Sequence, residues 1–390
     1  MQLDFPEPSA DALAHSERLS IEVRAAIAAN NGWISFADYM NTVLHAPGLG
    51  YYSAGARKFG AAGDFVTAPE ISSLFSQCIA GQCAQVLNQL GGGDILEPGA
   101  GTGIMAADIM LELERLDALP ARYLILEPSA DLRARQAETI ARMIPHLQTR
   151  VSWLDRSPLQ PVRGVLLANE VLDALPVSRF IMRNGVPHEL GVAWSGEDFN
   201  YTARPAGRQL AAGVATILHQ TGTQLPEGFT SELCLQLPAW LQTASDWLKE
   251  GVALIFDYGF TRREYYLPER QSGTLRCYFR HRAHENPFLW PGLQDITAWV
   301  DFSYLAESAL AAGFDVTGFT TQANFLLASG IDQRVADLAA DGRAQVAMAA
   351  GLRQLLLPGE MGEAVKVISL GRGGVAPPTA MSGRDLRSRL

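Results

Sequence analysis

The chain has 390 residues, of which 48% are hydrophobic and 18% are charged, a composition that supports a large core in one or two domains. Its formal net charge of −10 argues against a broad nucleic-acid-binding face, which usually needs a stripe of Lys and Arg. No apolar run reaches the roughly eighteen residues that span a bilayer, and the N-terminus is acidic where a targeting peptide would be basic. We expect a cytoplasmic protein that neither binds nucleic acid nor inserts into a membrane.

Cysteine and histidine usage predicts neither a disulfide framework nor a metal site. The four cysteines show no CxxC pairing, so they are interpreted as small buried apolar residues in a reducing compartment: Cys78, Cys83, Cys234 and Cys277. His281 and His284 have an H-x-x-H spacing, but no matching Cys or His pair lies nearby in the sequence. We therefore predict no metal.

The first ninety residues are expected to form an N-terminal helical lobe with a lid loop. Residues 18–45 carry apolar residues at helical spacing, interrupted at Asn30-Asn31-Gly32, which predicts two short helices and a turn. Residues 48–72 are rich in Gly and aromatics and lack periodicity, as a binding loop would. A helix is then expected over residues 72–90, ended by three glycines.

From Asp94 the pattern changes to short apolar runs that alternate with helical stretches. This alternation is typical of a doubly wound α/β fold with a mainly parallel sheet. We assign residues 91–177 and 248–370 to this Rossmann-like domain. The runs that predict its strands are residues 94–101, 123–128, 150–155, 164–170 and 252–259.

The long gap between the fourth and fifth runs predicts an inserted α+β region over residues 178–247, which would cover the substrate. Within it, Asn184-Gly185 separates two strand-like runs, the favoured sequence for a type I′ hairpin turn. Beyond an irregular stretch, residues 260–295, we expect a helix over 304–312, a strand at 321–330, a helix over 333–356 and a strand at 365–371. The tail, residues 371–390, is expected to be disordered.

A glycine-rich turn follows the first run. Glu97 precedes alternate glycines at Gly99, Gly101 and Gly103, which would let the backbone approach a ligand at the carboxyl end of a strand. A carboxylate beside the turn suits the positively charged S-adenosylmethionine better than a pyrophosphate. Glu127, at the end of the next run, could accept both ribose hydroxyls. The segment also fits the looser G-x-G-x-x-A pattern, so a nicotinamide dehydrogenase is an alternative.

The fourth run ends in polar side chains beside the expected methyl group. Asn169, Glu170 and Asp173 are the candidate catalytic residues, because carboxylates could clamp a guanidinium or amine and accept its departing proton. The competing interpretation is that Glu170 or Asp173 merely caps a following helix. Residues 257–259 could line the same crevice or simply end a strand.

A second polar cluster lies on the irregular N-terminal loop. Asp64, Thr67, Pro69 and Glu70 are candidates to close over the cofactor. Thr67 and Glu70 could equally just start the helix that follows.

Several segments together resemble the MidA family, bacterial relatives of the mitochondrial complex I assembly methyltransferase. They read GYYSAGARKFGAAGDFVTAPEISSLF, ILEPGAGTG, LANEVLDALPV, IFDYGF, GTLRCYFRHRAHENPF and GLQDITAWVDFSYLA, and they span most of the chain in the family's order. Ser76 stands where the family pattern has Gly, and Trp299 where it has His.

The resemblance implies a class I methyltransferase fold, S-adenosylmethionine as cofactor, and methylation of an arginine in a protein client, with a respiratory complex subunit as the client in the mitochondrial relative. It places the glycine motif and the signature of Asp64, Thr67, Pro69 and Glu70 at the cofactor. Two alternatives stay open: a cofactor-binding assembly chaperone without strong catalysis, and a methyltransferase of small molecules.

Overall fold

The structure is a computed structural model that describes residues 6–53, 66–338 and 342–390. Contacts divide the chain into two compact units. Unit 1 comprises Met1–Phe65, Leu172–Leu237 and Thr261–Asp301, and unit 2 comprises Val66–Val171, Pro238–Phe260 and Phe302–Leu390. None of the described helices is long and apolar enough to cross a membrane.

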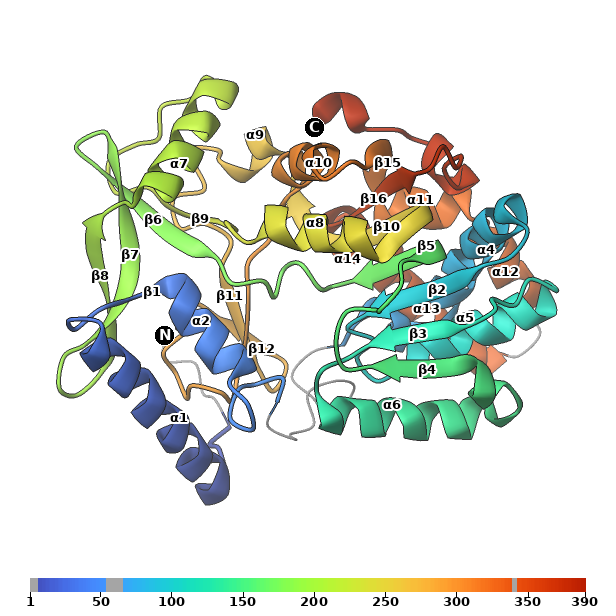
Figure 1. The fold of residues 1–390 in the computed structure, drawn as a ribbon, viewed down its shortest axis with the longest axis horizontal. Coiled ribbons are helices and arrows are strands. Elements are labelled where there is room, and N and C mark those ends of the chain that lie inside the picture. Colours follow the sequence, from blue (N-terminus) through green and yellow to red (C-terminus); the bar gives the residue numbers. More distant parts are fainter. Residues whose placement is uncertain (1–5, 54–65, 339–341) are drawn as a thin grey trace. The chain divides into compact units, whose positions relative to one another are not determined.

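Unit 2 is built on a sheet with the strand order β15-β16-β10-β5-β2-β3-β4 (Figure 1). Neighbouring strands from β10 to β4 pair in parallel, whereas β16 runs antiparallel to both β10 and β15. This confirms the doubly wound α/β class predicted from the alternating runs. The strands are β2 (Asp94–Pro98), β3 (Tyr123–Leu126), β4 (Val151–Leu154), β5 (Val162–Asn169), β10 (Leu248–Phe260), β15 (Asp315–Thr321) and β16 (Val365–Arg372).

Helices flank this sheet, and the apolar residues between them form the core of unit 2. Helix α4 begins after the Ser72 cap and ends at Gly91, whose φ of 70° suits glycine, as predicted. It packs against α5, β5 and β10, whereas Figure 1 shows α8 and α10 on the sheet face turned to the viewer. The longer helices are α4 (Ser73–Leu90), α5 (Ile104–Arg115), α6 (Ala130–Met143), α8 (Leu237–Trp247), α10 (Phe302–Ala311), α12 (Ile331–Leu338) and α13 (Gly342–Leu356); the short elements are α3 (Ala68–Ile71), η1 (Pro145–Arg150), α11 (Gln322–Ala328), α14 (Met361–Ala364), η2 (Thr379–Ser382) and η3 (Arg387–Arg389).

Unit 1 combines the N-terminal helices with antiparallel sheets. One sheet has the order β1-β7-β6-β9, with β8 beside β7, and a smaller one has the order β12-β11-β13. The hairpin between β6 and β7 turns at Asn184 and Gly185, with φ values of 50° and 76°, which confirms the predicted type I′ turn. The elements are α1 (Ala10–Ala29), β1 (Ile34–Ser35), α2 (Phe36–His45), β6 (Ser178–Arg183), β7 (Val186–Trp194), β8 (Phe199–Pro205), α7 (Arg208–Thr221), β9 (Thr230–Leu233), α9 (Arg262–Tyr265), β11 (Arg276–Phe279), β12 (Arg282–His284), β13 (Asp295–Thr297) and β14 (Val300–Asp301).

Two sequence-based expectations about the C-terminal part are wrong. Residues 322–328 form helix α11, not a strand, because the Thr321 hydroxyl caps its first turn and Phe325 and Leu326 bury one face; a short apolar run does not distinguish the two structures. The tail is not disordered either. The amides of Thr379 and Ala380 donate at 3.0 Å to glutamine side chains of α4, and Met381 is buried in the core.

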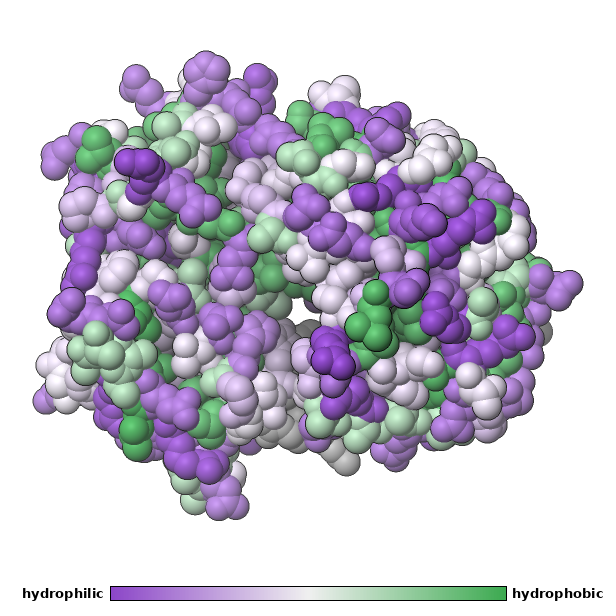
Figure 2. Space-filling model, in the orientation of Figure 1, coloured by the Kyte–Doolittle hydropathy of each residue, from purple (hydrophilic) through white to green (hydrophobic). Residues whose placement is uncertain are grey.

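The unit boundaries also differ from the expected domains. Helix α4 packs on the sheet of unit 2, so the N-terminal lobe ends before it rather than at residue 90. Residues 261–301, expected in the Rossmann-like domain, belong to unit 1. The face shown in Figure 2 is mainly hydrophilic with hydrophobic residues in small groups, as expected for a chain that buries apolar residues in one core in each unit.

Candidate functional site

The predicted glycine turn joins β2 to α5 in unit 2. Gly99, Gly101 and Gly103 all have left-handed backbone, with φ values of 69°, 53° and 79°, a conformation that costs other residues free energy. A Cβ on Gly103 would lie 3.1 Å from the Cα of Gln136. The turn therefore requires glycine for its conformation and, at Gly103, for its close packing against α6.

Glu127 follows β3, as predicted, and its side chain is buried. Its carboxylate accepts hydrogen bonds from the Ser129 amide at 2.9 Å and from the Gln136 side-chain amide at 3.2 Å. The same Gln136 amide group donates to the Gly101 carbonyl at 3.1 Å. Gln136 thus ties the glycine turn to the Glu127 carboxylate. Sequence reasoning missed it because one polar residue within a helix carries no motif.

Glu97 lies within β2 and is 2% exposed. Its Oε2 accepts a hydrogen bond of 2.7 Å from the Tyr123 hydroxyl on the adjacent strand. Burial raises the pKa of Glu97 to about 7, and the Tyr123 hydrogen bond opposes that rise because it favours the ionised form. Glu97, which precedes the glycine turn, therefore has a pKa close to neutral pH.

Replacing Tyr123 by Phe should destabilise the protein by about 1–3 kcal/mol, because it leaves a buried carboxylate oxygen without its donor. The loss should grow as pH rises through about 7, the pKa of Glu97, since the donor stabilises the ionised form that prevails above that pKa. Urea unfolding at pH values below and above 7 measures both effects. A loss that does not change with pH would contradict the assignment of this donor to Glu97.

The carboxyl end of β5 holds Asn169 and Glu170. Glu170 has a left-handed backbone with φ of 52°, which is unfavourable for a residue other than Gly, Asn or Asp. Its Oε1 accepts from the Ala68 amide at 3.3 Å and from the Asn169 side-chain amide at 3.2 Å. The element that follows is the strand β6, so Glu170 does not cap a helix.

Burial raises the pKa of Glu170 to about 8, and the negative charges of Asp257 and Glu70 act in the same direction. The Ala68 and Asn169 hydrogen bonds oppose the rise. Asp257, fully buried in β10, accepts from the amides of Val171 at 3.2 Å and Tyr258 at 2.8 Å. Asp257 therefore joins the ends of β5 and β10 beside Glu170.

The N-terminal signature lies partly in unit 2. Thr67 precedes the short helix α3 without a side-chain capping bond, and Pro69 lies in its first turn. The Glu70 carboxylate accepts a hydrogen bond of 3.3 Å from Thr102 of the glycine turn. Helix α3 therefore contributes both the Ala68 amide at Glu170 and the Glu70 carboxylate at the turn. Asp64 lies outside the described residues.

Asp173, the third candidate catalytic residue, is buried. It belongs to unit 1, where its backbone carbonyl accepts from the Ala298 amide at 2.9 Å. Of the two histidines, His281 is exposed and His284 is buried. Across the described ranges, no three His, Cys, Asp or Glu side chains group as a metal site would need.

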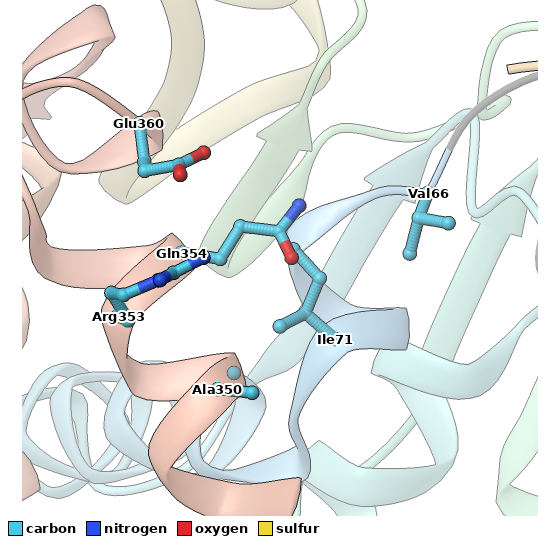
Figure 3. A pocket seen from close by; sticks show the side chains of 7 residues that line it. Val66, Ile71, Ala350, Arg353, Gln354 and Glu360 are labelled. Atoms are coloured by element: carbon cyan, nitrogen blue, oxygen red, sulfur yellow. The ribbon is translucent and has the colours of Figure 1, made fainter.

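A pocket of about 490 Å³ opens beside α3 in unit 2, within the size range of small-ligand sites. Figure 3 shows Gln354 of α13 extending toward Ile71 of α3, with Val66 on the far side. Arg353 and Glu360 add charged groups to its wall. No sequence motif predicted this pocket, because the residues of its two walls are almost three hundred positions apart in the chain.

Comparisons with known proteins give a consistent result. A family model described as "Putative S-adenosyl-L-methionine-dependent methyltransferase" matches residues 78–320. The mitochondrial protein arginine methyltransferase NDUFAF7 homolog of Drosophila melanogaster is 27% identical over 95% of this chain and 89% of its own. The mouse mitochondrial protein arginine methyltransferase NDUFAF7 is 29% identical over 86% and 80%.

A solved structure is also similar over the whole chain. It is a Burkholderia thailandensis protein described as a "likely methyl transferase" bound to S-adenosyl-homocysteine, 42% identical, covering 99% of this chain and 100% of its own, with a TM-score of 0.94. These matches confirm the resemblance drawn from the sequence motifs, the fold class and the cofactor.

Proposed function

The chain belongs to the MidA-like family of S-adenosylmethionine-dependent methyltransferases, and from this premise we propose that it methylates an arginine side chain of a protein client. The observation that carries the proposal is the partly buried Glu170 carboxylate at the end of β5, with the fully buried Asp257 beside it. Clustered carboxylates suit a guanidinium, which is planar, cationic and rich in hydrogen-bond donors. The similar fly and mouse proteins are named protein arginine methyltransferases, in agreement with this substrate class.

We assign the cofactor to the glycine turn of unit 2. When bound, S-adenosylmethionine supplies a methyl group on a positively charged sulfur. The residues present fit it: the left-handed glycines leave the backbone open to close approach, and Glu127 offers a buried carboxylate at the end of the next strand for ribose hydroxyls. The other residues proposed for the cofactor site are Glu97, Thr67, Pro69 and Glu70.

Glu170 would orient the acceptor nitrogen and accept the proton that this nitrogen loses, and Asn169 would hold its carboxylate through their hydrogen bond. The Ala68 amide of α3 donates a second hydrogen bond to the Glu170 carboxylate and so also holds it in place. Asp173 of unit 1 is proposed as a further carboxylate for the acceptor. Fixed hydrogen-bonding groups of this kind act by alignment and by electrostatic stabilisation.

Turnover should depend on pH through Glu170. Because its pKa is raised to about 8, Glu170 is mostly protonated at neutral pH and gains its charge only as pH rises through that value. We expect kcat/KM to rise about tenfold per pH unit below this pKa and to level off above it. Asp257→Asn should move the inflection to lower pH, since the Asp257 charge raises the pKa. A flat profile between about pH 6 and pH 9 in the unaltered protein would contradict the role of Glu170.

The substrate assignment can be tested directly with peptides. The purified protein is incubated with S-adenosylmethionine and a peptide library in which each Arg-containing member has a Lys counterpart. Mass spectrometry should find methyl groups on arginine in the first set and none on its counterparts. Equal methylation of both, or of small molecules alone, would contradict the proposal. Parallel calorimetric titrations with S-adenosylhomocysteine and NADH should show binding of the first ligand only.

A further inference from the structure

Left-handed backbone at residues other than glycine is confined to a few places among the described residues. Three of the seven such residues are Asn or Asp, which tolerate this conformation: Asn31, Asp117 and Asn184. Glu170 is the fourth, in the candidate active site. The other three are Arg280, His281 and Trp290, with φ values of 47°, 61° and 45°, all within eleven residues of unit 1. Backbone strain of this kind is often retained for function.

Arg280 and His281 form the turn of a β-hairpin. Strands β11 and β12 pair antiparallel with Phe279 opposite Arg282, so two residues connect them, and both have positive φ. This is a type I′ turn, which strongly favours Asn-Gly. The same unit uses Asn184-Gly185 for the same purpose between β6 and β7, with φ values of 50° and 76°. One hairpin thus has the favourable turn residues, and the other keeps Arg-His at a conformational cost.

The side chains at the strained turn make a compact basic and aromatic surface. Arg280, His281 and Arg282 are exposed. The Arg280 guanidinium lies over the Phe279 ring at 5.2 Å and donates to the Glu7 carbonyl at 3.4 Å, and the Phe279 ring packs on Trp290 with centroids 4.9 Å apart. We call Phe279, Arg280, His281, Arg282 and Trp290 the basic tip.

Three consecutive exposed residues of the basic tip, Arg280, His281 and Arg282, are of basic type, although the chain as a whole carries −10. Arg280 and Arg282 bring two guanidinium groups to one turn, and guanidinium groups bind carboxylates through paired hydrogen bonds. Stacking on Phe279 restricts Arg280, which lowers the entropy lost when it binds a partner.

We propose that the basic tip binds an acidic segment of the protein substrate. The inference rests on the proposed function, because it takes the substrate to be a protein. A peptide segment fits better than a nucleic acid, since the chain's net negative charge would repel a long polyanion, whereas a few Asp or Glu residues need only the exposed guanidinium groups of this turn.

The test replaces the strained turn with the relaxed one, Arg280→Asn with His281→Gly. The probe is a fluorescein-labelled peptide with one Arg flanked by Glu, compared with the same peptide carrying Gln, both measured by fluorescence anisotropy. The unaltered protein should bind the Glu peptide more tightly, and added salt should weaken that binding. The double variant should lose about three- to fivefold in affinity for the Glu peptide, the effect of one or two exposed ion pairs.

The same double variant should melt about 2 °C higher or more, since Asn-Gly relieves the turn. Arg183→Asn is the matched control: it removes an exposed arginine beside the other hairpin turn and should change neither peptide affinity nor the preference for Glu. A rise in stability with loss of Glu-peptide affinity supports the proposal.

Three results of the binding measurements overturn it: equal binding of the two peptides, unchanged affinity in the double variant, or tighter binding of a single-stranded RNA than of the Glu peptide. An unchanged or lower melting temperature would also overturn it, because the turn would then carry no cost. Failure of the proposed function would appear in a different experiment, the methylation assay, as the absence of methyl transfer to any Arg peptide. The anisotropy measurement does not depend on that transfer.

Discussion

Replacing Gly101 by Val should abolish binding of S-adenosylmethionine, weakening it by about 100-fold or more, equivalent to roughly 2.7 kcal/mol. Gly101 has φ of 53°, which a β-branched residue adopts only at a cost, and its carbonyl is held by Gln136 at 3.1 Å. The new side chain would also enter the space where the turn is proposed to meet the cofactor. Calorimetric titration with S-adenosylmethionine and S-adenosylhomocysteine measures the effect.

Gly185→Val is the matched control for Gly101→Val. It separates the effect of backbone strain from the effect of losing the cofactor site. Gly185 has φ of 76° in the β6–β7 turn, and a Cβ there would have no heavy atom within 4 Å. This variant should lose stability to the same kind of strain yet bind the cofactor with unchanged affinity. If Gly101→Val kept its affinity within a few-fold, the cofactor would not lie on the glycine turn.

Replacing Glu170 by Gln should lower kcat by about 100-fold or more, the usual contribution of a positioned general base. The amide keeps one oxygen to accept from Ala68 but takes up no proton and brings no charge to a guanidinium. Cofactor affinity should stay within a few-fold, because the Glu170 carboxylate accepts its hydrogen bonds from Ala68 and Asn169, which lie outside the glycine turn. Rapid-quench turnover and calorimetry on the same preparation give the two quantities.

The matched control is Glu250→Gln. Glu250 lies near the start of β10, at the opposite end of that strand from Asp257, in a surface pair with Arg163. Surface pairs contribute little to stability, so this change should leave both turnover and cofactor affinity unaltered. An equal loss of turnover and cofactor affinity in Glu170→Gln would assign Glu170 to the cofactor site instead of the acceptor site.

Local patterns predicted much of the candidate site because its residues follow strands in fixed motifs. The glycine turn, Glu127 and the Asn169-Glu170 pair could each be placed at the carboxyl end of a strand from the alternating runs. Glu170's conformation could not be predicted, since nothing in its neighbours requires a positive φ. Gln136 and Thr102 also gave no signal, because their partners come from distant segments.

By itself, the sequence determined the α/β class, the strands of the parallel part of the sheet, the Asn184-Gly185 turn and the family, because these depend on periodicity, turn chemistry and contiguous motifs. Only the tertiary structure decided what depends on contacts between distant segments. Burial among helices fixed α11 and the ordered tail, and the approach of β10 and α3 to Glu170 set its pKa. The Arg280-His281 turn is the plainest case: its residues disfavour the conformation that strand pairing imposes on them.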